Sequence, residues 1–311
     1  MTLLAVQNLT VDLPLAGLFA RARLNILSGI SLTLGPAETL GLVGESGSGK
    51  TTLARAILGL QKISAGTITL DGKPLATNAD FAKIRRHSAM MFQDAVASLS
   101  PRMTVGQLIR EPFAIHRVPM PPGTVAALLT QVGLPPDIAD RYPHALSGGQ
   151  ARRVGVARAL ALAPKLVIAD EPTAGLDMSV QAEILNLMND LKDELRLSYL
   201  IISHNLALVR HVADRIAVMY LGRLVETGPT AQVFASPRHP YTASLIAADP
   251  KPDPRQRRAD LAIKGEIPSV LRRPTGCEFH TRCPQARDLC RTTAPQLTEK
   301  APGQMARCHF T

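Results

Sequence analysis

Short apolar runs and longer amphipathic segments alternate along most of the chain. Residues 38–44 and 166–170 are apolar runs too short for buried helices, and each is typical of a buried strand of a parallel sheet. Residues 51–60 and 179–195 repeat apolar side chains at helical spacing. The two predicted apolar stripes consist of Leu53, Ile57 and Leu60, and of Val180, Ile184, Leu187, Leu191 and Leu195. The pattern favours an α/β fold.

The same pattern divides the chain into regions. The first segment, MTLLAVQNLTVDL, lacks the basic lead of a signal peptide and predicts a strand at a sheet edge. Asp71 and Gly72 suit a two-residue hairpin turn. Prolines and short helical pieces predict a helical subdomain at about 93–147. We expect a core over residues 1–235 and a proline- and arginine-rich C-terminal extension over residues 236–311.

The composition of the chain favours some classes of protein over others. The chain has 311 residues, 46% of them hydrophobic, which is enough to bury a core. It holds no run of ~20 uninterrupted apolar residues, so we expect no membrane span and a cytoplasmic protein. The net charge is +10, and residues 251–311 hold 12 Lys+Arg against 6 Asp+Glu. With no Trp and 4% aromatic residues there is little for base stacking, so we expect no nucleic-acid partner.

A phosphate-binding loop is predicted at residues 44–51, which read GESGSGKT between a predicted strand and a predicted helix. Its backbone N–H groups and the helix N-terminus are expected to surround the β-phosphate of a bound nucleotide. Lys50 should reach the β- and γ-phosphates, and the Thr51 hydroxyl should bind Mg²⁺. The predicted phosphate-binding residues are Gly44, Glu45, Ser46, Gly47, Ser48, Gly49, Lys50, Thr51 and Thr52.

Two carboxylates follow the apolar run LVIAD. Asp170 ends this strand where open α/β sheets bind ligands, and it can hold the metal through water. Alternation along the chain would point Glu171 to the other side of the metal, as general base for the attacking water. Gln93 is expected to reach the metal and this water, and His204 to contact the γ-phosphate. The predicted Mg²⁺ ligands are Thr51, Gln93 and Asp170.

The motif LSGGQ predicts a second anion site. Its residues are Leu146, Ser147, Gly148, Gly149 and Gln150. Because Ser147 precedes two glycines and a helical stretch, its hydroxyl and the following N–H groups can bind an anion. A turn that only caps the helix is the alternative.

The phosphate loop, LSGGQ and LVIADE together resemble the ATP-binding cassette (ABC) ATPases. The resemblance implies an ABC-type P-loop ATPase core and a helical subdomain, with Gln93 in the Q-loop, His204 as switch histidine and Asp177 in the D-loop. It further implies a head-to-tail dimer in which LSGGQ covers the γ-phosphate of the partner's ATP. Asn205 stands where the family usually has Asp, and Leu13 and the displaced Phe19 replace its adenine-stacking aromatic residue.

The C-terminal extension indicates one group within the ABC ATPases. Residues 236–250, 265–270 and 276–290 resemble the C-terminal extension of oligopeptide and dipeptide importer ATPases. This implies a peripheral protein at the cytoplasmic face of the inner membrane. Its partners would be a second ABC ATPase subunit, two integral membrane permease subunits and an external substrate-binding protein, with a permease helix docking into residues 93–146. The alternatives are a soluble ABC ATPase acting on ribosomes or nucleic acid, and a scaffold ATPase without turnover.

All four cysteines lie in the last 35 residues, at Cys277, Cys283, Cys290 and Cys308. This clustering predicts a zinc or iron–sulfur site. The spacing lacks the paired CxxC knuckles of zinc sites, and the resemblance implies a 4Fe-4S cluster with a structural role, zinc being the alternative. Two disulfides would be the interpretation for a secreted chain.

Overall fold

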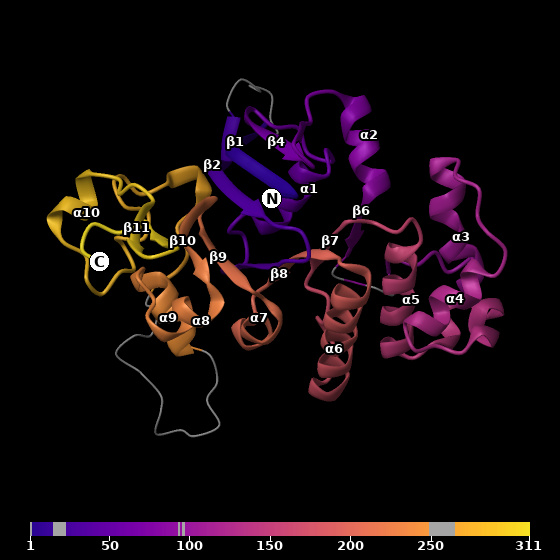
Figure 1. Ribbon diagram of the computed structural model, residues 1–311. Coiled ribbons are helices and arrows are strands. Elements are labelled where there is room, and N and C mark those ends of the chain that lie inside the picture. Colours follow the sequence, from indigo (N-terminus) through magenta and orange to yellow (C-terminus); the bar gives the residue numbers. More distant parts are fainter. Residues whose placement is uncertain (1, 15–22, 93, 95–96, 249–264) are drawn as a thin grey trace. The chain divides into compact units, whose positions relative to one another are not determined.

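The computed structural model describes residues 2–14, 23–92, 94, 97–248 and 265–311 (Figure 1). These residues form two compact units. The first unit comprises the described residues of 35–38 and 77–201, and the second comprises those of 2–34, 39–76 and 202–311.

The second unit contains an antiparallel sheet with the order β2-β1-β4-β5. Its strands are β1 (Leu4–Pro14), β2 (Arg23–Leu34), β4 (Ala65–Leu70) and β5 (Lys73–Pro74). Because β1 pairs with β2 on one side and β4 on the other, the prediction of an edge strand at the N-terminus is wrong. The hairpin is confirmed, since Asp71 (φ 49°) and Gly72 (φ 72°) both adopt the positive φ that its two-residue turn requires.

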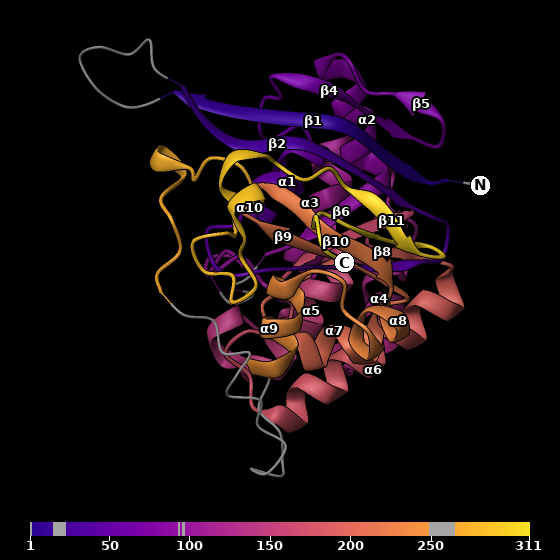
Figure 2. The same cartoon turned by 90° about the vertical axis from the view of Figure 1, so that its left-hand side faces the viewer.

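A second run of strands in this unit has the order β11-β12-β10-β9-β3. The strands are β3 (Thr39–Val43), β9 (Arg215–Tyr220), β10 (Arg223–Pro229), β11 (Thr298–Ala301) and β12 (Gln304–Ala306). All five residues of β3 are buried and β3 pairs in parallel with β9, as the apolar run predicts. The C-terminal hairpin adds to the same sheet through β12 and β10 (Figures 1 and 2).

Short helices complete the second unit. They are α1 (Lys50–Ile57), α7 (Leu206–Val212), α8 (Thr230–Ala235), α9 (Pro240–Ala248), α10 (Asp288–Thr292) and the 3-10 helix η5 (Val270–Arg272). The predicted apolar face of α1 is right for Leu53 and Ile57, which are buried, and wrong for Leu60, which is 54% exposed. The helix ends before Leu60, because Gly59 turns the backbone with a φ of 67°.

The first unit combines parallel strands with longer helices. Its strands are β6 (Ser88–Met91), β7 (Leu166–Asp170) and the start of β8 (Ser198–Ser203). Its helices are α2 (Asn78–His87), α3 (Val105–His116), α4 (Thr124–Gln131), α5 (Gly148–Leu160), α6 (Met178–Leu195) and the 3-10 helices η1 (Pro136–Asp140) and η2 (Pro143–Ala145). Its regular elements between residues 97 and 147 are all helical, in the region of the predicted helical subdomain.

Helix α6 matches the clearest helix of the sequence, but its buried face differs from the predicted stripe. The buried side chains are Ile184, Leu185, Met188 and Leu191. Leu195, the last member of the predicted stripe, is 39% exposed. The buried face includes neighbours of the predicted positions because the elements that pack against α6, and not periodicity alone, decide which side chains are buried. In the part of the chain that the structure describes, no helix is long and apolar enough to cross a bilayer.

A buried carboxylate fastens the C-terminal hairpin to the sheet. Glu226 on β10 is fully buried. It accepts hydrogen bonds from the backbone N–H groups of Arg238 (2.7 Å) and His239 (2.9 Å) and from Nε2 of Gln304 (2.7 Å). Gln304 on β12 is also fully buried and donates to the carbonyl of Ser236 at 2.9 Å. Because buried polar groups need partners, these bonds hold β10, the residues before α9 and β12 together.

Replacing Glu226 with alanine should therefore destabilise the protein. The change leaves buried donors without their acceptor, and we expect a loss of about 2–4 kcal/mol in the free energy of unfolding. Denaturant titration of both variants measures it. Glu299→Ala is the control, because Glu299 is exposed and accepts one bond from Gly303 in a turn. Equal losses in the two variants would contradict the role of Glu226.

Candidate functional site

The predicted phosphate loop joins β3 to α1 in the second unit. Gly44 has a φ of 152°, and a Cβ atom there would lie 2.2 Å from the carbonyl oxygen of Met219 on β9. Gly49 has a φ of 99°, and its Cβ would lie 2.7 Å from Cδ2 of Leu27. Both positions require glycine, because the backbone conformation and the lack of space each exclude a side chain. The loop therefore curls tightly beside β9.

Lys50 lies inside this curl. It is 7% exposed, and Nζ donates to the carbonyl oxygens of Gly44 (2.7 Å) and Glu45 (2.9 Å). Its ammonium is thus at the N-terminus of α1, where backbone N–H groups already favour an anion. The remaining residues of the predicted set are the exposed Ser46 and Gly47, the buried Ser48, the half-buried Gly49, and Thr51 and Thr52, half-buried in the first turn of α1.

His204 also belongs to the second unit. It is exposed and follows Ser203, the last residue of β8. Asn205 begins α7, and its Oδ1 accepts a hydrogen bond from the N–H of Leu208 at 3.1 Å. Asn caps a helix as well as Asp does, so this departure from the ABC pattern leaves the helix start intact. Leu13 on β1 is half-buried, and the predicted residues Phe19 and Gln93 lie outside the described residues.

The two predicted carboxylates lie in the first unit, at the end of β7. All five residues of β7 are buried, and Asp170, its last residue, is 6% exposed. Glu171 has a φ of 50°, which is uncommon for a residue other than glycine. The chain leaves the strand conformation here, so this turn, rather than strand alternation, sets the direction of the Glu171 side chain. Backbone strain of this kind gathers at functional sites.

Asp177 begins α6. Its Oδ1 accepts hydrogen bonds from the N–H of Val180 (3.0 Å) and from the hydroxyl of Ser179 (2.8 Å). The bond from Val180, and then that from Ser179, lower the pKa of Asp177. Asp177 is therefore a helix cap, in addition to the interface role that the sequence predicts for it.

Ser147 begins α5 with a capping box. Its Oγ accepts from the N–H of Gln150 (3.2 Å), and its own N–H donates to Oε1 of Gln150 (3.0 Å). The capping interpretation of LSGGQ is thus correct as local structure. Ser147 and Gly148 are exposed and Leu146 and Gly149 are half-buried, so the N-terminus of α5 is open to an external ligand.

Arg152 is a residue that sequence reasoning missed. Its side chain is buried, and Nη2 donates to the carbonyl oxygen of Ala174 at 2.7 Å. Burial lowers the pKa of Arg152. The bond ties α5, which begins at LSGGQ, to the turn that follows Glu171. A charged residue among the apolar positions of a helix is its only signal in the sequence.

A cavity of about 200 Å³ lies in the first unit between α3, α5 and β6. Among its lining residues, Phe92 is 46% and Ile115 is 67% exposed. Arg158 on α5 also lines the cavity. Its guanidinium donates to Glu111 of α3 (2.6 Å) and to the carbonyl of Ser98 (3.1 Å), which links α5 to α3. A cavity with both charged and apolar lining residues thus borders α5, the helix that begins at LSGGQ.

The four cysteines line one small cavity in the second unit. Cys290 is buried in α10, and Cys277, Cys283 and Cys308 are half-buried. The N–H of Cys277 donates to the carbonyl of Cys290 at 2.8 Å, which brings the two segments together. All four are free thiols, so the disulfide alternative finds no support in the described part of the tail.

The tail also tests the predicted metal site. Within the described ranges, no three or more His, Cys, Asp or Glu side chains are grouped so that they could hold a metal ion. Burial, with a smaller contribution from the neighbouring thiols, raises the pKa of Cys277 to about 11. The predicted clustering of the cysteines is present, whereas a metal-binding arrangement is not shown. A metal would have to displace the protons of these thiols.

Comparison with known proteins identifies the family. Residues 27–174 match the ABC transporter family, and residues 225–290 match the C-terminal region of the oligopeptide/dipeptide transporter family. A Brucella ovis protein whose name describes ATP binding for peptide import is 46% identical over 296 residues, which cover 92% of each chain. The oligopeptide transport ATP-binding protein AppF of Bacillus subtilis is 42% identical over 320 residues, covering 99% of this chain and 97% of AppF.

Solved structures of ABC cassettes have a similar fold. The cassette cbiO1 of Clostridium perfringens, part of an ABC transporter complex, superposes with a TM-score of 0.66 at 29% identity, over 76% of this chain and 91% of cbiO1. The dimeric bacterial ABC cassette MJ0796 superposes with a TM-score of 0.65 at 26% identity, over 73% of this chain and 98% of MJ0796. The chain belongs to the ABC transporter ATPases, in the group that carries the oligopeptide/dipeptide C-terminal region. It is an ATPase.

Proposed function

We propose that this protein is the ATP-hydrolysing subunit of an ABC importer for peptides or related small solutes. The observation that carries the proposal is the presence of both family regions in one chain, with an oligopeptide transport relative similar over almost its whole length. Neither alternative, a soluble ABC ATPase acting on ribosomes or nucleic acid and a scaffold ATPase, has comparable support.

The chemistry of the site follows from its residues. The loop from Gly44 to Gly49, Lys50 and the first turn of α1 would bind the phosphates of ATP, because fixed N–H dipoles and an ammonium favour them. Thr51 and Asp170, a hydroxyl in a first helical turn and a buried carboxylate at a strand end, fit the oxygen ligands that Mg²⁺ prefers. Bound Mg²⁺ would neutralise phosphate charge.

The remaining catalytic roles are assigned by residue type. Glu171 would accept the proton of the attacking water as general base. His204 would donate to the γ-phosphate, and Gln93 would complete the metal and water contacts.

Two copies of the ATPase, or two paralogues, would share each ATP. The exposed N-terminus of α5 at Ser147 supports this arrangement, because its N–H groups can meet the γ-phosphate bound by a partner chain. Asp177 would lie at the same interface. The two ATPases would then close head to tail on binding and separate after hydrolysis.

The transporter would also contain two integral membrane permease subunits and an external substrate-binding protein. We place the ATPase domain at residues 1–235 and the importer-type extension at residues 236–311. The cavity lined by Phe92 and Ile115 supports a binding site for a permease helix, because these exposed apolar side chains line it together with residues of the LSGGQ helix. The protein would thus be peripheral, at the cytoplasmic face of the inner membrane.

We also propose that the four tail cysteines hold a 4Fe-4S cluster. Their common cavity supports a shared ligand. One zinc ion needs four ligands at about 2.3 Å, whereas a cluster spaces its cysteine sulfurs farther apart. We favour the cluster because the cysteine spacing lacks the paired CxxC knuckles common in zinc sites, and zinc stays the alternative. The cluster would cross-link the tail.

Replacing Glu171 with glutamine should separate binding from hydrolysis. ATP and Mg²⁺ should still bind, since the phosphate loop is unchanged, while hydrolysis slows by at least about 10²-fold, the scale of a positioned general base. The dimer should remain closed with ATP. Nucleotide binding and steady-state hydrolysis of the assembled transporter measure both effects. Near-normal turnover would refute the assignment of Glu171.

Replacing Ser147 with arginine tests the shared site. An arginine is too large for close contact with a partner's γ-phosphate, so dimer closure and hydrolysis should fail. ATP binding to the isolated chain should stay largely intact. Titration of the monomer with MgATP and sizing of the ATP-bound dimer provide the measurements. If the monomer loses nucleotide binding, LSGGQ serves its own phosphate loop and the two-chain arrangement is wrong.

Metal analysis tests the cysteine site. After anaerobic purification, the wild type should contain iron and sulfide in about equal amounts, and Cys290→Ser should lose most of both, because one of four ligands is missing. Iron, sulfide and zinc are measured on the same samples. About one zinc per chain without iron would show that the site binds zinc and would refute the cluster. Absence of all three would refute any metal site.

A further inference from the structure

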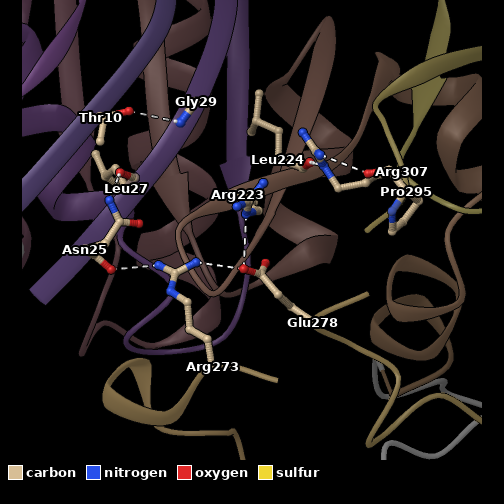
Figure 3. A network of polar contacts seen from close by, with 10 residues as sticks. All are labelled: Thr10, Asn25, Leu27, Gly29, Arg223, Leu224, Arg273, Glu278, Pro295 and Arg307. Atoms are coloured by element: carbon tan, nitrogen blue, oxygen red, sulfur yellow. Dashed lines mark hydrogen bonds and ion pairs between the residues drawn. The ribbon is translucent and has the colours of Figure 1, made fainter. Parts of the chain in front are cut away.

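One tail segment is fastened to the second unit at both ends. We call residues 277–283 the cysteine loop. Near its start, Glu278 accepts hydrogen bonds from Arg273 (2.8 Å) and Arg223 (3.1 Å), and Arg273 also donates to the carbonyl of Asn25 at 2.7 Å (Figure 3). This network joins the loop to β2 and β10.

At the other end of the cysteine loop, Arg282 forms an ion pair with Glu45 of the phosphate loop. Nη1 and Nη2 of Arg282 donate to Oε2 and Oε1 of Glu45 at 2.7 and 2.9 Å. The Arg282 side chain is 5% exposed, and its guanidinium carbon lies 5.8 Å from the ring centroid of Tyr220. Two parallel bonds fix the orientation of the carboxylate as well as attracting it.

Each polar group of Glu45 is engaged. Its carboxylate is held by Arg282, and its N–H donates to Oη of Tyr241 at 2.9 Å. Its carbonyl accepts from Nζ of Lys50 (2.9 Å) and from the N–H of Ser48 (3.2 Å). The tail thus holds Glu45 on one side, and the phosphate loop's own lysine holds it on the other.

An aromatic cluster supports these contacts. Tyr241 and Tyr220 have ring centroids 4.8 Å apart, and Phe279 of the cysteine loop lies 5.3 Å from each. All three rings are buried to 1% exposure or less. Because such rings fill a close-packed core, neither Tyr241 nor the cysteine loop can shift independently of the other.

We propose that Arg282 and Tyr241 are positioning residues of the ATP site, through which the cysteine loop sets the affinity of the phosphate loop for nucleotide. The inference rests on the proposed phosphate-binding role of residues 44–51. A glycine-rich loop that is held in its binding shape loses less conformational entropy when it binds. By linkage, bound nucleotide stabilises the tail contact by the same factor.

The test measures nucleotide binding by the full chain, with MgATP and MgADP in calorimetric titrations. Arg282→Gln and Glu45→Gln should each weaken binding by about fivefold or more, the usual lower bound for coupled sites. Arg282→Lys keeps the charge and should bind at an intermediate affinity. The double variant should bind no more weakly than the weaker single variant, because both changes break one contact. In hydrolysis, KM for ATP should rise more than kcat falls.

Two controls separate the possible failures. Glu299→Gln changes an exposed tail carboxylate outside the cysteine loop, and its affinity should stay within about twofold of wild type. If Glu299→Gln weakens binding as much as Arg282→Gln does, or if Arg282→Gln binds normally, the proposal is overturned. Lys50→Ala tests the underlying site. Normal nucleotide binding by Lys50→Ala refutes the proposed phosphate site itself. Lost binding by Lys50→Ala supports that site. The affinity of Arg282→Gln then decides whether the tail acts on the site.

Discussion

The buried ammonium of Lys50 imposes the geometry on which the rest of the site depends. An ammonium removed from water needs oxygen acceptors, and here the carbonyls of Gly44 and Glu45 provide them. Both carbonyls reach Nζ only if the chain curls directly after β3, which explains a glycine at position 44 with a φ of 152°. The same curl directs the N-terminus of α1 towards the loop interior. A positive charge and a helix dipole therefore act at one point.

The two helix N-termini that the sequence predicts as anion sites are built differently. Gly49 precedes α1 and provides no side-chain cap to it. Ser147 begins α5 and accepts the N–H of Gln150. Its hydroxyl can still donate its proton, because a hydroxyl has one donor and two lone pairs. Capping its own helix and contacting a partner's phosphate are therefore compatible roles for Ser147.

Local features could be predicted from the sequence, and long-range contacts could not. The strands β3 and β7, the Asp71–Gly72 turn and the existence of α6 follow from periodicity and turn chemistry within a few residues. The exact face of α6 depends on what packs against it, and periodicity alone cannot place that face. The Glu45–Arg282 pair spans 237 positions, and nothing near either residue in the sequence marks its partner.

The structure of the C-terminal tail also depends on long-range contacts that the sequence does not predict. The strands β11 and β12 are short and contain few apolar residues, so no pattern predicts them, yet they extend the sheet that includes β3. Buried bonds at Glu226 and partly buried ones at Glu278 and Arg282 hold the tail, beside one small aromatic cluster. Such bonds act only at particular distances and angles, so they specify one arrangement. The four cysteines line one cavity within this tail, and the Arg282 bonds that help to hold the tail also reach the loop expected to bind ATP.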